Sequence, residues 1–139
     1  MEMRVEHIQS ETAVTILSLV GELDASNYLA LVEKVAALYQ TGSRNLLIDL
    51  SELTFMASSG LVAFHRVALI MRGAVDDPNK EGWNPMRAIA HEVKNEVDHD
   101  NHCKLLNPQP RVAQTLQVTG FDKIMTIYFD RDAAITSFT

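Results

Sequence analysis

Residues 46–61 read LLIDLSELTFMASSGL, and this stretch decides how the rest of the chain is organised. Its first part, residues 46–50, is a short apolar run that is typical of a buried strand. Its last part opens the run LVAFHRVALI at residues 61–70, whose apolar positions recur at helical spacing. The sequence therefore predicts a strand, then a loop, then a helix that starts close to the hydroxyls of Ser58 and Ser59.

A serine at the start of a helix can cap the helix, bind an anion or be chemically modified. On the residues alone, capping is the commonest of these roles. Ser58 has no histidine partner that the sequence makes evident, as nucleophilic catalysis would require. The chain also lacks a glycine-rich phosphate loop and a dinucleotide fingerprint. These observations argue against an enzyme.

Composition narrows the class of protein further. The chain has 139 residues, the size of one domain, and its 47% hydrophobic and 22% charged residues are typical of a globular protein. A net charge of −6 argues against nucleic-acid binding and suits a protein partner with a basic patch. The single cysteine, Cys103, allows no internal disulfide, so we expect a cytoplasmic protein. No signal sequence is evident, and the apolar run at residues 61–71 is too short to span a membrane.

Strand and helix patterns alternate along most of the chain. We expect strands at residues 4–9, 13–20, 45–50, 104–106 and 123–128, and helices at residues 26–40, 59–72, 85–97, 111–118 and 130–138. Each strand–helix–strand connection implies a parallel strand pair with a right-handed crossover. Residues 73–103 interrupt the alternation with a polar, turn-rich start. We interpret them as an insertion within one domain that spans residues 1–139.

Several motifs in this order resemble the STAS domain of bacterial anti-sigma factor antagonists. They are GELD at residues 21–24, LIDLS at 47–51, FMASSGL at 55–61, LLNPQPRV at 105–112 and LQVTGF at 116–121. The resemblance implies an α/β domain with a mixed four- to five-stranded sheet whose first strand is antiparallel to the rest. It also implies that the helices pack mainly on one face, with the insertion added as a loop and a helix.

The resemblance further implies a mechanism known as partner switching. The unphosphorylated domain binds an anti-sigma factor of the serine-kinase type and so frees a sigma factor. The kinase then phosphorylates a serine at the start of the second helix, and a phosphatase reverses the modification. Ser58 matches that phosphoacceptor, with Ser59 as the fallback. The family usually has Asp immediately before the phosphoacceptor, whereas this chain has Ala57. The resemblance implies neither catalysis nor a cofactor.

We expect the partner-binding face to form around this serine. Its members would be Gly21, Glu22, Asp24, Asp49, Ala57, Ser58, Ser59, Gly60 and Leu61. For Asp24 and Asp49 an equally good interpretation is that they cap helices or order loops at strand ends. In the first helix, either Asp24 or Ser26 is suited to be the N-cap.

Two features of the insertion have alternative explanations. The ligand-type residues His91, His99, His102 and Cys103 have spacings unlike those of a compact zinc motif, so we expect no metal site. Trp83 and the helix at residues 85–97 either pack on the domain or form a second interface, for a homodimer or a dedicated partner.

Two other functions remain open on the sequence. One is an interaction scaffold in stress signalling that is never phosphorylated, which Ala57 favours. The other is a sensor that binds a nucleotide or lipid near the start of the second helix.

Overall fold

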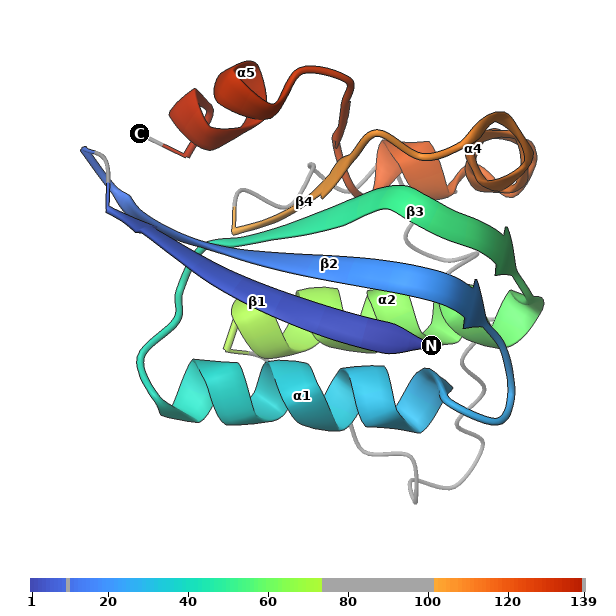
Figure 1. Cartoon of the computed structure of the whole chain (residues 1–139), viewed down its shortest axis with the longest axis horizontal. Helices are drawn as coiled ribbons and strands as arrows, with labels where there is room; N and C mark the ends of the chain where they lie inside the picture. Colours follow the sequence, from blue (N-terminus) through green and yellow to red (C-terminus); the bar gives the residue numbers. More distant parts are fainter. Residues whose placement is uncertain (10, 74–101, 139) are drawn as a thin grey trace.

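The computed structural model describes residues 1–9, 11–73 and 102–138. They form a five-stranded sheet in the order β1-β2-β3-β4-β5 (Figure 1). The strands are β1 Glu2–Gln9, β2 Ala13–Leu23, β3 Leu46–Met56, β4 Cys103–Leu106 and β5 Ile127–Tyr128. The helices are α1 Tyr28–Gln40, α2 Ser58–Met71, α4 Pro110–Val118 and α5 Arg131–Thr136, with a 3₁₀ helix at Phe121–Lys123. The helix expected at residues 85–97 lies outside the described residues.

The pairing within the sheet confirms the expected mixed α/β fold. β1 is antiparallel to β2, and the other neighbouring strands are parallel. The last strand is shorter than expected, because the 3₁₀ helix Phe121–Lys123 and a turn occupy most of residues 121–126. The remaining element boundaries outside β2 and β3 lie within two residues of those expected.

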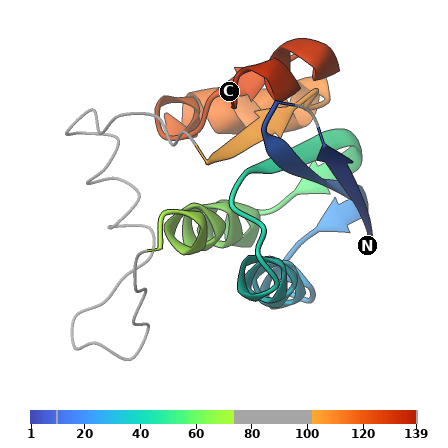
Figure 2. The same ribbon diagram turned by 90° about the vertical axis from the view of Figure 1, so that its left-hand side faces the viewer.

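Helices cover both faces of the sheet unequally. α1 and α2 lie side by side on one face, and α5 lies on the other (Figures 1 and 2). The larger core cluster joins Leu17 and Ile48 of the sheet to Val35 of α1 and Phe64 of α2. A smaller cluster, which includes Ala134 of α5, packs on the opposite face. The central strands β2 and β3 are therefore buried on both faces, which explains their nearly continuous apolar sequences.

Local sequence signals explain where α1 forms and where it ends. Its buried residues recur every three or four positions and are Leu31, Val32, Val35 and Leu38. The helix ends at Gln40 with Thr41 as its C-cap, and Gly42 follows with a φ of 112°. Glycine adopts this conformation without the steric cost that a Cβ would add.

The expected loop between β3 and α2 is wrong, because β3 does not end at Leu50. It continues to Met56 and pairs along its length with β2, which itself extends past Gly21 to Leu23. In the register, Ser18 pairs with Asp49, Gly21 with Leu53 and Leu23 with Met56. Between the first and second of these pairs, β3 contains one residue more than β2. Between the second and third pairs it again contains one residue more. These are two β-bulges.

The bulges explain why the sequence pattern failed here. Leu50, Leu53 and Met56 all belong to the same core cluster, although their spacing of three cannot follow strict strand alternation. Each bulge shifts the alternation by one residue and so returns the next apolar side chain to the core. Strand and loop patterns cannot be told apart when the alternation is broken in this way.

The substitution Leu53→Ala tests this extension of β3. Leu53 is completely buried, so we expect its truncation to lower the free energy of unfolding by about 2–5 kcal/mol. The exposed neighbour Glu52 is the control, and Glu52→Ala should change stability by about 0.5 kcal/mol or less. Chemical denaturation of both variants measures the difference. Equal, small effects would mean that residues 51–56 are a surface loop.

Candidate functional site

The carboxyl ends of β2 and β3 meet the start of α2 at one edge of the sheet (Figure 1). The backbone N–H of Ala57 donates a hydrogen bond of 2.9 Å to the carbonyl of Leu23. Ala57 has extended backbone angles and is the N-cap of α2, so Ser58 is the first helical residue. A single residue therefore joins the strand to the helix and fixes where the serines lie.

The two serines occupy different environments. Ser58 is exposed. The Oγ of Ser59 is buried and has no hydrogen-bond partner among the described residues. The capping role considered for Ser58 is wrong, because Ala57 occupies the N-cap and no side chain caps α2. Of the two hydroxyls, that of Ser58 is the one that a partner protein can reach.

Gly60 and Leu61 hold the start of α2 against the sheet. A Cβ at Gly60 would overlap the side chain of Met56 and come within 3.0 Å of Leu23 Cδ2. Leu61 is only 2% exposed and belongs to the core. Both were expected on the partner-binding face. Their structural role is instead to set the position of Ser58, with no side-chain surface to offer.

Hydrogen bonds fix the turn between β2 and α1. Asp24 Oδ1 accepts from the backbone N–H of Ser26 at 2.9 Å and from the Ser26 hydroxyl. Asn27 donates from Nδ2 to the carbonyl of Glu22 at 2.8 Å and accepts from the N–H of Asp24 at 2.9 Å. The expected capping of α1 by Asp24 or Ser26 is wrong, because Asn27 is the N-cap and Asp24 orders the preceding turn.

The same contacts set the charge of this turn. The hydrogen bond from the Ser26 hydroxyl, together with the one from its backbone N–H, lowers the pKa of Asp24 below its ordinary value. Both bonds favour the ionised carboxylate over the protonated acid. The turn beside Leu23 therefore presents a fixed negative charge next to the start of α2.

Asp49 lies well away from Ser58. It pairs with Ser18 and with Leu106 in the middle of β3, and its Oδ1 accepts from the N–H of Ser51 at 3.0 Å. At about 3.3 Å per residue, the rest of β3 separates it from Met56 by roughly 20 Å. The expectation that Asp49 shares a surface with Ser58 is therefore wrong. The cause is the continuation of β3, which moves the strand end.

Phe55 is a surface residue of this site that the sequence pattern did not reveal. Its side chain is 39% exposed, and it pairs in the register with Glu22. The bulge before it leaves both Thr54 and Phe55 outside the core, between buried Leu53 and Met56. An apolar ring thus lies among the polar residues at the sheet edge. No sequence signal identifies it unless the bulge is known.

Other kinds of site receive no support from the described residues. Within residues 1–9, 11–73 and 102–138, no three His, Cys, Asp or Glu side chains gather as they would around a metal ion. Cys103 is buried in β4, and His102 Nδ1 lies 3.2 Å from Asn45 Oδ1. His91, His99 and Trp83 lie outside the described residues. In that same part of the chain, no helix has the length and apolar character needed to cross a membrane.

The fold is that of a STAS-type α/β domain. The family model for the MlaB-type STAS domain matches residues 6–77, slightly more than half of the chain. The chain therefore belongs to the STAS domain family. Among curated proteins, no sequence relative matches it.

Solved structures of the same fold cover nearly the whole chain. An anti-sigma factor antagonist from Mycobacterium paratuberculosis is 19% identical, covers 99% of this chain and 94% of its own, and has a TM-score of 0.63. A Thermotoga maritima protein provisionally named an anti-sigma factor antagonist is 16% identical. The match covers 98% of this chain and 93% of that protein, with a TM-score of 0.70. The phosphorylated form of the Bacillus cell fate determinant SpoIIAA is 21% identical. The match covers 99% of this chain and 100% of that protein, with a TM-score of 0.55. At these identities the likeness is one of fold.

The substitution Gly60→Ala tests how tightly α2 is held. In an ordinary helix this change favours folding by up to about 1 kcal/mol. Here we expect it to destabilise the protein by about 1–3 kcal/mol, because the added methyl overlaps Met56. Thermal or chemical denaturation measures the effect. In the matched double variant, Met56→Ala should remove much of the penalty of the Gly60 change, and strict additivity would refute the proposed contact.

Proposed function

We propose that this protein is an anti-sigma factor antagonist that binds a serine-kinase-type anti-sigma factor and is released from it by phosphorylation of Ser58. Membership of the STAS family and the fold shared with proteins named antagonists support this proposal. The contact surface, here named the switch face, consists of Gly21, Glu22, Asp24, Phe55, Ala57 and Ser58. In this scheme the kinase provides the catalysis, and the protein provides the hydroxyl.

The observation that carries the proposal is the difference between the two serines. Phosphoryl transfer needs an accessible hydroxyl, and Ser58 is exposed whereas the Oγ of Ser59 is buried. In the reaction, Ser58 Oγ forms a bond to the γ-phosphorus of ATP as the bond to the ADP leaving oxygen breaks. The hydroxyl proton passes to a base of the kinase or to solvent. Ser59 would need α2 to move before it could react.

The start of α2 tolerates the charge that phosphorylation adds. A phosphate group carries about −1.5 to −2 at neutral pH. The first N–H groups of a helix have no acceptor within the helix, and its dipole favours negative charge there. The fold should therefore persist after modification. A partner pressed against Ser58 would instead lose its contact, so the modification controls binding.

The chemistry of the switch face indicates the kind of partner that it fits. Glu22 and the ionised Asp24 give it negative charge, in agreement with the net charge of −6. Phe55 adds an exposed aromatic ring of the type that anchors protein interfaces. We infer that the anti-sigma factor presents a basic surface around an apolar pocket. A cytoplasmic phosphatase would then restore the binding form.

Incubation with the cognate kinase-type anti-sigma factor and ATP tests the modification. We expect intact-mass spectrometry to show the gain of one phosphoryl group in the natural protein and in Ser59→Ala, and no gain in Ser58→Ala. The far-ultraviolet circular dichroism of the modified protein should match that of the unmodified one.

Two results would overturn this assignment. Phosphorylation that persists in Ser58→Ala would place the modified residue elsewhere. No phosphorylation of the natural protein, with tight binding of the same anti-sigma factor, would favour the scaffold that is never modified.

The variant Phe55→Ser tests the contact surface. Removal of an aromatic anchor typically costs 2 kcal/mol or more of binding free energy, so we expect roughly 30-fold weaker binding to the anti-sigma factor by calorimetry. Phe129, which is 66% exposed on the segment after β5, provides the matched control. Phe129→Ser should leave the affinity within about twofold. Equal losses in both variants, or no loss in either, would exclude Phe55 from the contact.

A further inference from the structure

The outer side of β1 is an open strand edge of eight residues (Figures 1 and 2). Of the five described strands, β1 and β5 lie at the two edges of the sheet, and β5 has just two residues. In β1 only Met3 and Ile8 are partly buried, and the other residues are exposed. β1 therefore presents a row of backbone N–H and C=O groups to which another strand can be added.

The register of the hairpin shows which backbone groups of β1 point outward. The N–H of Thr15 donates to the carbonyl of Asn45 at 2.9 Å, so the backbone groups of Thr15 point toward β3. His7 lies opposite Thr15 in the antiparallel pair. Since Thr15 is turned away from β1, this pair exchanges no backbone hydrogen bonds, and the N–H and C=O of His7 point to the open edge. Strand alternation gives the same direction to Met3 and Val5.

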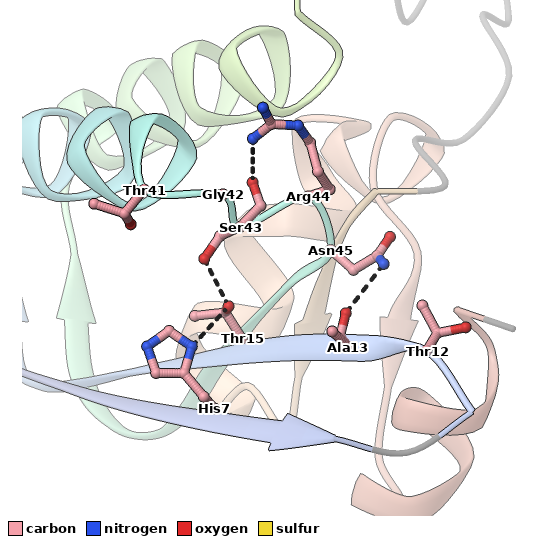
Figure 3. A pocket seen from close by; sticks show the side chains of 9 residues that line it. All are labelled: His7, Thr12, Ala13, Thr15, Thr41, Gly42, Ser43, Arg44 and Asn45. Atoms are coloured by element: carbon pink, nitrogen blue, oxygen red, sulfur yellow. Dashed lines mark hydrogen bonds between the residues drawn. The ribbon is translucent and has the colours of Figure 1, made fainter.

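Side-chain contacts hold the hairpin end of β1 in place. His7 Nδ1 lies 3.3 Å from Thr15 Oγ1, which in turn lies 2.8 Å from Ser43 Oγ in the turn before β3 (Figure 3). On the opposite face, Glu6 accepts a hydrogen bond of 2.9 Å from Arg131 of α5. The register with β2 also runs without a bulge along the whole of β1. The edge is therefore held in a regular shape before another strand arrives.

The sequence of β1 is complementary to a second copy of itself. β1 has no proline, lysine or bulge, the features that usually protect a strand edge. Instead, Glu2, Arg4 and Glu6 alternate in sign along one face. When two copies run antiparallel with Val5 opposite Val5, each Arg4 lies opposite Glu6 of the other copy. The two valines, each 36% exposed, meet at the centre.

This register is favoured over its neighbours. A shift of the pairing by one residue would place outward-pointing backbone groups opposite groups that point away. A shift by two residues would place Arg4 opposite Arg4, or Glu6 opposite Glu6, and like charges directly opposite each other are destabilising. Arg4 already contacts Glu2 at 3.1 Å, but a guanidinium has five N–H donors and a carboxylate two oxygens, so each can hold a second partner.

We propose that two copies of this protein join through their β1 edges, antiparallel and with Val5 at the two-fold axis, into one continuous sheet. Val5 with itself and Met3 with His7 form the hydrogen-bonded pairs. Arg4 and Glu6 form the pairs between them, where facing Cα atoms come within about 4.5 Å. The antiparallel arrangement points the two switch faces toward opposite ends of the joined sheet, and the interface is closed because both copies use the same edge. The dimer does not depend on the proposed function and goes beyond it.

Sedimentation velocity over a concentration series from about 1 μM to 1 mM tests the dimer in the full chain. We expect the natural protein to change from monomer to dimer as its concentration rises. Arg4→Glu and Glu6→Arg each place like charges in both charged pairs, so each should weaken self-association roughly tenfold or more. In an equimolar mixture of these two variants, opposite charges face each other again between unlike copies. The mixture should therefore form a heterodimer, which also shows that both variants are folded.

Two further variants separate edge pairing from general effects. Arg111→Glu, at an exposed position on α4, changes the net charge by the same amount as Arg4→Glu and should leave self-association unchanged. Val5→Pro removes an outward N–H that the monomer does not use for pairing with β2, and it should weaken self-association roughly tenfold or more.

Three results would overturn the proposal. The first is a natural protein that stays monomeric throughout the series, including the case in which Val5→Pro weakens binding to the anti-sigma factor because a strand of that partner occupies the edge. The second is a mixture of Arg4→Glu and Glu6→Arg that associates no better than either variant alone. The third is a loss in Arg111→Glu equal to that in Arg4→Glu.

Discussion

The parallel pairing of β2 with β3 is the constraint on which the rest of the structure depends. Among the described strands, β2 and β3 are the longest, with eleven residues each, and core residues lie on both their faces. Their pairing continues through two bulges to Leu23 and Met56, and the bond from Ala57 N–H to Leu23 then fixes the start of α2. The orientation of Ser58 follows from this bond and from the close approach at Gly60. The chemistry at the sheet edge is thus set by backbone geometry.

Helix phase separates two neighbouring hydroxyls that look equivalent in the sequence. Successive residues of a helix point about 100° apart, so Ser58 and Ser59 cannot both face solvent when Gly60 and Leu61 press the same turn onto the sheet. The Oγ of Ser59 is buried without a hydrogen-bond partner among the described residues, an arrangement that costs stability. Close packing of α2 on the strand ends accounts for it. The exposed Ser58 and the buried hydroxyl of Ser59 therefore both follow from the way α2 packs on the strand ends.

The fold could be predicted from the sequence to the extent that its signals are local. Apolar spacing located α1 and α2 to within two residues. The family resemblance gave the mixed sheet and the position of Ser58. The true length of β3 could not be predicted, because each bulge breaks the alternation that identifies a strand. Because the length of β3 was underestimated, Asp49 was expected near Ser58, the exposure of Phe55 was missed, and residues 51–56 were expected to form a loop.

The order of the strands across the sheet, β1 to β5, is also their order along the chain. Among the described strands, each one after β1 therefore pairs with a neighbour that precedes it in the chain, and none inserts between two earlier strands. Such a topology allows the sheet to grow from one edge during synthesis, with β1 and β2 closing first through a short hairpin. The switch-face junction is formed by residues up to the end of α2 at Met71, all of which precede β4 in the chain. The amino-terminal half thus has the contacts to begin assembling its own core while the carboxyl-terminal half is still being made.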